Sequence, residues 1–293
     1  MNEKRNIICF GEMLWDCYPN EIKPGGAPLN VAAHLAQLGN QATILSKVGE
    51  DKLGEELIAY SSDLKVDCSL VQRSTTAPTG QVLVQLTEKG IPSYDILEPA
   101  AWDSIQSSHQ ASIQVSKAAA LVYGSLASRS DLSRNTLLEL LKVSQLNICD
   151  LNIRQQYYSR ALIYEILSKT HILKINEDEA VLLAELFELD PAKIIQQLTD
   201  KFMLDMIILT LGSKGAEVFH KGILYKAQTY KIVPVDTVGS GDAFLATFID
   251  GLLHGKRIEI VLDAAMRMGA YVATQKGAIP DHNYELIAEL KKA

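Results

Sequence analysis

The chain has few cysteines and no long apolar run, and each shortage excludes a class of protein. Its 293 residues include four cysteines, which form no C-x-x-C pair and have no histidine at a spacing that suits zinc. No apolar stretch approaches the roughly 18 residues of a membrane-spanning helix. No segment has the G-x-x-x-x-G-K-S/T spacing of a P-loop. A zinc module, a transmembrane protein and a P-loop enzyme are therefore not expected.

Basic residues are also in short supply, with 28 Lys and Arg against 35 Asp and Glu and a net charge of −7. This balance argues against a nucleic-acid partner, which usually requires a basic face. It leaves room for a small anionic ligand, because a local group of N–H donors and one cation can hold a phosphate. The first five residues are polar and no apolar signal segment follows them. We expect a soluble, cytoplasmic protein with no membrane partner.

Short apolar runs alternate with amphipathic helical patterns along the chain. This alternation predicts an α/β fold of three layers, with a mostly parallel central sheet covered by helices on both faces. Buried strands are predicted at 7–10, 43–48, 119–123, 146–150, 171–175 and 206–211, and helices at 29–38, 53–61, 133–143, 177–186 and 192–202. The pattern after Phe244 is mostly helical.

One segment interrupts this rhythm. Residues 81–87 and 93–97 read as two strands joined by a Glu88-Lys89-Gly90 turn, which predicts a β-hairpin. An antiparallel hairpin does not belong inside a parallel sheet, so we expect a small second sheet. It would form a lid from about 12–24 and 80–100, inserted in one domain that spans 1–293. A surface hairpin without function is the alternative.

Residues 236–244 (DTVGSGDAF) place two glycines and a carboxylate directly before an apolar helical run. Glycines allow a tight turn, and the first turn of a helix leaves N–H groups without intrahelical partners. These groups and the helix dipole favour an anion, most naturally a phosphate. Asp242 would repel that phosphate, so its better role is to take a proton from the attacking group. A glycine turn with Asp as a helix cap is the alternative.

Polar residues follow several predicted strands, and the carboxyl ends of strands in open α/β sheets surround the ligand. Asn176 and Glu179 either cap a helix or, through Glu179, organise water around Mg²⁺. The turn 210–215 (TLGSKG) either lines a nucleotide or is a plain hairpin turn. Arg154 either binds a phosphoryl or carboxylate oxygen or pairs with Asp150 at the surface.

Taken together, these segments resemble the ribokinase-like carbohydrate kinase family, also called the PfkB family, over essentially the whole chain. Residues 25–57 are similar to its N-terminal motif, 236–244 to its D-T-x-G-A-G-D-x-F motif and 176–179 to N-x-x-E. Ser240 replaces the usual alanine. The resemblance implies an ATP-dependent sugar kinase with a ribokinase-like fold, and a homodimer formed through the lid.

The family's roles carry over to matching positions. Asp242 would be the catalytic base, and the turn before it would form the anion hole with Gly239, Ser240 and Gly241. The resemblance implies sugar contacts from Asp16, Gly25, Gly26, Asn30 and Arg154. It implies ATP contacts from Asn176, Thr210, Gly212, Gly215, Gly239 and Gly241. Glu179 would bind Mg²⁺ through water, and Asp236 with the Val238 carbonyl would bind a monovalent cation such as K⁺ beside the 273–277 loop.

The substrate is less sharply indicated. Residues 11–16 (GEMLWD), 25–30 (GGAPLN) and 150–154 (DLNIR) are most similar to the fructokinase branch. We therefore expect fructose to be phosphorylated to fructose 6-phosphate. The string D-x-N-x-R also occurs in 2-keto-3-deoxygluconate kinases, so that acid sugar, ribose and nucleosides remain open. A sugar sensor without turnover is a further alternative.

Overall fold

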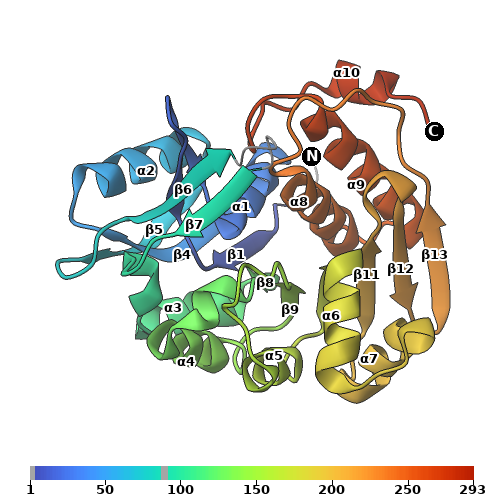
Figure 1. Cartoon of the computed structure of the whole chain (residues 1–293), viewed down its shortest axis with the longest axis horizontal. Coiled ribbons are helices and arrows are strands. Elements are labelled where there is room, and N and C mark those ends of the chain that lie inside the picture. Colours follow the sequence, from blue (N-terminus) through green and yellow to red (C-terminus); the bar gives the residue numbers. More distant parts are fainter. Residues whose placement is uncertain (1–3, 87–91) are drawn as a thin grey trace.

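The computed structural model describes residues 4–86 and 92–293 and shows a nine-stranded sheet between two layers of helices (Figure 1). The strand order is β13-β12-β11-β10-β9-β8-β1-β4-β5, parallel from β5 to β11 and antiparallel at β12 and β13. Each predicted strand is present. The strands are β1 (Asn6–Phe10), β4 (Gln41–Gly49), β5 (Asp67–Ser74), β8 (Ala120–Tyr123), β9 (Asn147–Asp150), β10 (Ile172–Asn176), β11 (Met206–Thr210), β12 (Ala216–His220) and β13 (Ile223–Ala227).

Helices cover both faces of this sheet because strand side chains alternate between two apolar cores. Ile7 and Cys9 of β1 belong to one core, and Ile8 and Phe10 belong to the other. The first core is covered by α1 (Ala27–Gln37), α2 (Lys52–Asp63), α8 (Ser240–Leu253) and α9 (Ile258–Ala273). The second is covered by α3 (His109–Lys117), α4 (Asp131–Leu140), α5 (Arg160–Leu167), α6 (Glu177–Phe187) and α7 (Ile194–Phe202).

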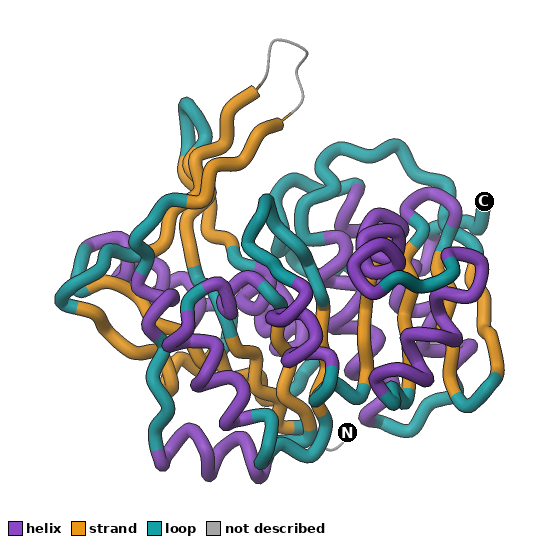
Figure 2. The backbone as a smooth tube through the Cα atoms, turned by 60° about the horizontal axis from the view of Figure 1, so that its bottom comes forward, coloured by secondary structure: helices purple, strands orange, loops and turns teal. Residues whose placement is uncertain are grey.

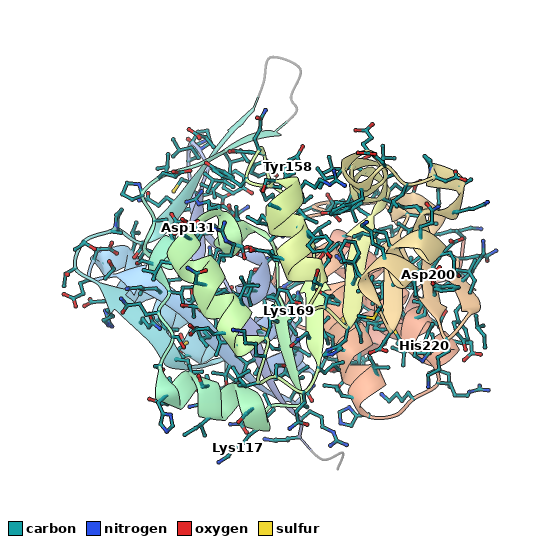
Figure 3. All side chains as sticks on the ribbon, turned by 90° about the horizontal axis from the view of Figure 1, so that it is seen from below. Lys117, Asp131, Tyr158, Lys169, Asp200 and His220 are labelled. Atoms are coloured by element: carbon teal, nitrogen blue, oxygen red, sulfur yellow. The ribbon has the colours of Figure 1, made fainter. Side chains whose placement is uncertain are left out.

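The second layer of helices is the one seen from below in Figure 3, where labels mark Lys117 at the end of α3, Asp131 at the start of α4 and Asp200 in α7. A short helix, α10 (Tyr284–Glu289), packs on α9 near the C-terminus. Short 3₁₀ turns lie at Ala101–Ser104, Leu126–Arg129, Pro191–Lys193 and Gly212–Lys214. The three-layer prediction is confirmed. Within the described residues, no helix combines the length and the apolar character that crossing a bilayer requires.

A second sheet of four strands stands apart from the large one and projects from the body of the molecule (Figure 2). Its order is β3-β2-β6-β7, with β2 (Leu14–Cys17), β3 (Ile22–Gly25), β6 (Gly80–Leu86) and β7 (Pro92–Ile96). Strands β6 and β7 are antiparallel, so the predicted hairpin is present, and β2, from the first part of the expected lid, pairs with β6 in parallel. The predicted turn at 88–90 lies outside the described residues.

The small sheet is joined directly to the first helix. Strand β3 ends at Gly25, and Gly26 is the N-cap residue of α1 with φ +108°. A Cβ atom at Gly26 would lie 2.4 Å from the Glu12 carbonyl oxygen, so only glycine fits there without displacing backbone. Pro28 lies in the first turn of α1, where its missing N–H costs nothing.

A loop from the large sheet also contacts the small one. The loop that follows β9 donates a hydrogen bond from Gln155 Nε2 to the Tyr94 carbonyl of β7, at 2.7 Å. Two non-glycine residues of this loop, Asn152 and Gln155, have φ of +43° and +48°. Such left-handed backbone is strained for a residue with a side chain. Arg154 lies between these two positions.

The order of the large sheet identifies where a ligand binds. From β1 the chain moves to β4 and β5 on one side, and later to β8 and the following strands on the other. This reversal creates a crevice at the carboxyl ends of β1 and β8, which is where open α/β sheets bind ligands.

Candidate active site

Asp242 lies in the first turn of α8, at the crevice. Asn30 of α1 donates a hydrogen bond from Nδ2 to Asp242 Oδ2, at 2.8 Å. This contact joins two helices that are more than 200 residues apart in the sequence. Burial in protein and the charge of Asp150 raise the pKa of Asp242 to about 6, although Asn30 and Lys174 oppose the shift. The carboxyl therefore gains basicity compared with an ordinary Asp.

The turn before Asp242 presents backbone amides. Gly239 is the N-cap residue of α8 and has φ +78°, and a Cβ atom there would lie 2.4 Å from the Ala278 carbonyl oxygen. The Ser240 N–H donates to the Thr237 carbonyl at 3.3 Å. The amides of Gly241 and Asp242 come next, at the positive end of the helix dipole. This geometry suits an anion beside the Asp242 carboxyl.

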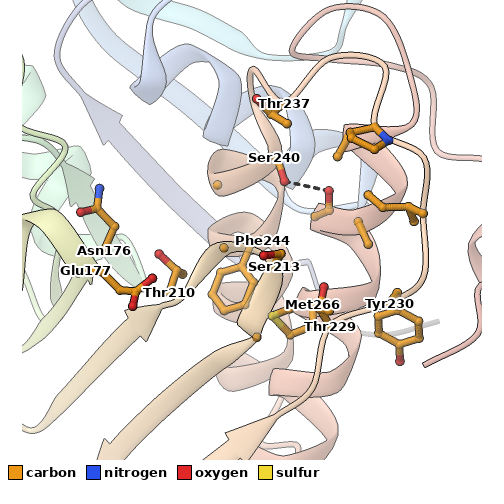
Figure 4. Close-up of a pocket in the computed structure, with 18 of the residues that line it drawn as sticks. Asn176, Glu177, Thr210, Ser213, Thr229, Tyr230, Thr237, Ser240, Phe244 and Met266 are labelled. Atoms are coloured by element: carbon orange, nitrogen blue, oxygen red, sulfur yellow. Dashed lines mark hydrogen bonds between the residues drawn. The ribbon is translucent and has the colours of Figure 1, made fainter. Parts of the chain in front are cut away.

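Two cavities meet at this turn. The larger has a volume of about 690 Å³ and lies between the ends of β10 and β11 and helices α8 and α9 (Figure 4). The smaller has a volume of about 370 Å³ and lies between α1, the small sheet and the ends of β9 and β10. Both are lined by Asn176, Thr210, Thr237 and Gly241. Asp242 lines the smaller cavity at this junction.

The smaller cavity contains most of the residues predicted to bind sugar. Asp16, Gly26, Asn30 and Arg154 all line it. Gly25 does not: it packs against Asp16 instead, and a Cβ atom at Gly25 would lie 2.5 Å from Asp16 Oδ2. Burial raises the pKa of Asp16 to about 6, and Arg154 and Lys23 oppose that shift. From the small sheet, Leu14, Val82, Tyr94 and Ile96 also line the cavity, so this sheet closes it on one side.

The larger cavity contains most of the residues predicted to lie along a nucleotide. Asn176, Thr210, Gly212, Gly215 and Gly241 line it, together with Ser240 of the predicted anion hole. Gly239 lines only the smaller cavity. The turn after β11 leads into the antiparallel strand β12, so it is a hairpin turn and also part of the cavity wall. Ser240 Oγ donates to the Gly269 carbonyl at 2.8 Å, which ties α8 to α9 at this wall (Figure 4).

Asn176 and Glu179 form a complete capping box at the start of α6. Asn176 Oδ1 accepts from the Glu179 N–H at 2.8 Å, and Glu179 Oε2 accepts from the Asn176 N–H at 2.9 Å. The capping interpretation is therefore confirmed. Glu179 Oε1 also accepts from the Ile153 N–H at 2.9 Å, and the side chain lines the smaller cavity. Both oxygens are thus held by backbone, which fits a contact to a metal through water better than a direct one.

Asp236 links the segment before α8 to the 273–277 loop. Its Oδ1 accepts from the Val238 N–H at 3.0 Å, and its Oδ2 accepts from the Gly277 N–H at 3.2 Å. The Ala273 carbonyl accepts from the Val235 N–H at 2.8 Å. A monovalent cation at Asp236 and Val238 stays a prediction.

One sequence-based alternative is wrong. Asp150 does not pair with Arg154 but with Lys174, whose Nζ lies 2.8 Å and 2.7 Å from the two carboxylate oxygens. The two residues are neighbours across β9 and β10. Arg154 is thus left to face the smaller cavity, where it opposes the raised pKa of Asp16, Glu12 and Asp242.

Sequence reasoning missed two residues of the site, Lys174 and Glu12. Each is buried, with 8% and 3% of its surface exposed, and each lines the smaller cavity. Burial raises the pKa of Glu12 to about 7, with Asp242 adding to the shift and Arg154 opposing it. The available signal was a charged residue within or beside an apolar strand, because such a side chain is rarely buried without a partner or a task.

The arrangement can carry out transfer of an anionic group. A basic carboxyl, two amides of the first turn of α8 and a buried ammonium surround the point where the two cavities join. The larger cavity has the size of a nucleotide or drug-sized site, and the smaller has polar groups suited to hydroxyls. No group of three or more His, Cys, Asp or Glu side chains that could hold a metal is found among the described residues.

Comparison with known proteins agrees with this geometry. A family model described as pfkB family carbohydrate kinase matches residues 4–283. Fructokinase-1 of Oryza sativa subsp. japonica is 28% identical over 303 residues, covering 94% of this chain and 93% of that protein.

Solved structures with the same fold include two sugar kinases. Fructokinase of Vibrio cholerae O395, bound to fructose, ADP and a calcium ion, has a TM-score of 0.84 at 24% identity and covers 98% of this chain and 99% of its own. 2-Dehydro-3-deoxygluconokinase of Thermotoga maritima has a TM-score of 0.86 at 20% identity, with 98% of both chains covered. At these identities the likeness shows the fold alone. The family match spans nearly all of the sequence and confirms the resemblance: the chain belongs to the pfkB family of carbohydrate kinases, which transfer a phosphoryl group to an alcohol.

Proposed function

We propose that this protein is an ATP-dependent fructokinase that phosphorylates fructose at O6. The observation that carries the proposal is the position of Asp242, where the two cavities meet and beside the amides that open α8. ATP would occupy the larger cavity and direct its γ-phosphoryl group to those amides. The sugar would occupy the smaller cavity and direct one hydroxyl to Asp242. A single kinase domain over the whole chain is part of this proposal.

The charges of the smaller cavity favour a neutral sugar. Five carboxyl groups line it, against two cations. Glu12, with its pKa of about 7, is partly protonated at neutral pH, but the other four carboxylates still outnumber the two cations. An anionic substrate would therefore be repelled, and the repulsion is strong where protein excludes water. The carboxyl groups belong to Glu12, Asp16, Asp150, Glu179 and Asp242, and the cations to Arg154 and Lys174. The oxygens of the carboxyl groups that are not paired with Lys174 can accept hydrogen bonds from several hydroxyls of a ketohexose.

The proposed chemical step is a direct transfer. The sugar hydroxyl gives its proton to Asp242 as its oxygen bonds to the γ-phosphorus, and the bond from that phosphorus to the β–γ bridging oxygen breaks and releases ADP. Helix amides of Gly241 and Asp242 stabilise the charge on the transferring group. Asn30 holds the carboxyl in one orientation through its 2.8 Å hydrogen bond. Mg²⁺, when bound with ATP, would neutralise phosphate charge, and Glu179 could hold its water shell.

A panel of substrates tests the proposal. We expect fructose to give the highest kcat/KM, at least about tenfold above that of 2-keto-3-deoxygluconate. The carboxylates of the smaller cavity repel the acid sugar, and a repulsion of about 1.4 kcal/mol corresponds to a tenfold change. Coupled ADP release would be measured for fructose, ribose, 2-keto-3-deoxygluconate and nucleosides, and the product's phosphate position determined by NMR. A higher kcat/KM for any other substrate would overturn fructose as the preferred acceptor.

The 2-keto-3-deoxygluconate kinase alternative is favoured by one observation, the placement of Arg154 in the smaller cavity, where a guanidinium could bind a carboxylate. The same panel decides between the two. Stabilisation by sugars without any ADP release would instead indicate a sensor. A lid-mediated homodimer, a monovalent cation at Asp236 and Val238 and a cytoplasmic location stay predictions.

The raised pKa of Asp242 predicts an acid limit on activity. Transfer needs the ionised carboxylate, so log kcat/KM is expected to fall with a slope near one as the pH drops below about 6. The measurement is fructose phosphorylation between about pH 5 and about pH 8 at saturating ATP and Mg²⁺. Activity that stays constant down to about pH 5 would contradict this prediction. It would mean that the carboxyl group needed in its ionised form has a pKa well below about 6.

A further inference from the structure

Lys174 is a buried ammonium with an incomplete set of protein partners. Two of its three donors are used by Asp150, at 2.7 Å and 2.8 Å, and the described residues give it no other hydrogen-bond partner. Only 8% of its surface is exposed, and the side chain lines the cavity assigned to the sugar. A buried ammonium with a free donor is costly unless something binds there. The third donor therefore indicates a ligand.

The strand geometry places this ammonium beneath the start of α8. Leu173 and Ile175 belong to the core covered by α3–α7, and Ile172 belongs to the core covered by α8. Because side chains alternate along a strand, Lys174 is on the α8 side of β10. A Cβ atom built on Gly241 would lie 3.6 Å from Lys174 Nζ. The ammonium is thus close to the amides that are proposed to hold the transferring phosphoryl group.

The surrounding charges keep Lys174 protonated. Burial alone would lower the pKa of this lysine, but Asp150 opposes that effect, with smaller contributions from Asp242 and Glu179, and the pKa is raised overall. The group is therefore a fixed positive charge at neutral pH. It cannot act as a base, but it can stabilise negative charge that builds up nearby.

We propose that Lys174 is a catalytic residue of this kinase: held by Asp150, its ammonium contacts the phosphoryl group as that group passes from ATP to the sugar hydroxyl. The proposal rests on the proposed function. Lys174 neither gains nor loses a proton in the step. The hydroxyl proton goes to Asp242, the new O–P bond forms, the bond to the β–γ bridging oxygen breaks, and ADP leaves.

The opposing explanation is that Lys174 only neutralises Asp150 in the interior. The two explanations differ in what happens when both charges are removed. Lys174→Gln alone leaves a buried carboxylate unpaired, which harms the site in either case. The double variant Asp150→Asn with Lys174→Gln removes the uncompensated charge and leaves two amides that can hydrogen-bond to each other. Asp150→Asn alone keeps the ammonium and serves as the matched control.

If Lys174 contacts the phosphoryl group, Lys174→Gln and the double variant are both expected to lose about 100-fold or more in kcat, as for removal of one donor to a developing anion. The KM for sugar should change by less than about threefold, since that donor acts mainly in the transition state. Asp150→Asn should lose less than about tenfold. Melting temperatures and the affinity for ADP would show that each variant is folded and binds nucleotide.

Recovery of the double variant to within about tenfold of the wild type would overturn the proposal and leave Lys174 as the counter-charge of Asp150. A loss confined to KM, or equal losses in Asp150→Asn and Lys174→Gln, would overturn it as well. Should Lys174→Gln fail to fold, the double variant and Lys174→Arg, which keeps the charge and should retain more activity than the double variant, decide the matter. A wild-type protein that phosphorylates no sugar would overturn the proposed function itself.

Discussion

Asp242→Asn is expected to lower kcat for fructose phosphorylation by about 10²–10⁴-fold, the usual contribution of a positioned general base. The amide has nearly the same shape as the carboxylate but accepts no proton at neutral pH. The single amide oxygen of the Asp242→Asn side chain can still accept a hydrogen bond from Asn30 Nδ2, so the contact between α1 and α8 can persist. The KM values for ATP and sugar are therefore expected to change little. Steady-state kinetics with a coupled ADP assay would measure both.

Asp63→Asn is the matched control for this variant, since it makes the same chemical change at an exposed position at the end of α2. It should be indistinguishable from the wild type. A kcat near the wild-type value for Asp242→Asn would remove this carboxyl from the chemical step. Loss of ADP binding together with kcat would show that the variant had disturbed the α8 turn instead.

Gly239→Ala is expected to lower kcat/KM by about 100-fold or more. Alanine at the φ of +78° seen at Gly239 costs roughly 1–2 kcal/mol. Its methyl group would also lie 2.4 Å from the Ala278 carbonyl oxygen and 2.6 Å from the Ala278 Cα. The backbone must move to relieve these contacts, and it carries the amides that follow. Misplacement of about 1 Å can cost 10²-fold in rate.

Gly222→Ala separates backbone strain from damage to the site. Gly222 lies between β12 and β13 with φ +77°, and an added Cβ atom there meets nothing within 4 Å. The Gly222→Ala variant should lose about as much stability as Gly239→Ala loses from its positive φ alone, and it should keep full activity. Thermal melting and kcat/KM measured on both variants make the comparison. Equal activity in Gly239→Ala and Gly222→Ala would show that the turn before Asp242 does not position a reacting group.

Local patterns were sufficient to predict six of the nine strands of the large sheet and most of its helices, but not β5, β12 or β13. The apolar runs 171–175 and 206–211 are adjacent parallel strands in the structure. They were recognisable because a strand buried on both faces consists almost entirely of apolar residues. The hairpin at 81–97 was predictable because two short strand patterns are separated by a turn sequence. The capping box of Asn176 and Glu179 was also readable, since it depends on residues three apart.

The candidate site was predictable where a residue ends a strand or opens a helix. Asp16, Asn30, Arg154 and Asp242 line one cavity, as their strand and helix ends indicated. Gly25 does not line this cavity because it packs against Asp16, and that position depends on the pairing of β2 with β3. No local rule gives that pairing.

The missed residues share a physical cause. Lys174 lies inside a strand, and its partner Asp150 is set by the register between β9 and β10. The nearer arginine was therefore the natural candidate in sequence, although it is not the partner in space. Glu12 follows β1 and is buried at a cavity that residues of the small sheet and α1 also line. Both depend on long-range packing, which apolar periodicity does not encode.

The route from the small sheet into α1 has a mechanical consequence. Gly26 is the single residue between β3 and the helix, and Asn30 lies one turn further on, with its amide on the Asp242 carboxyl. A displacement of the small sheet would move the first turn of α1 and weaken the hydrogen bond from Asn30 to Asp242. We therefore expect the position of the small sheet over the smaller cavity to be coupled to the orientation of the Asp242 carboxylate. ATP would then react little with water until a sugar fills the cavity and the small sheet closes over it.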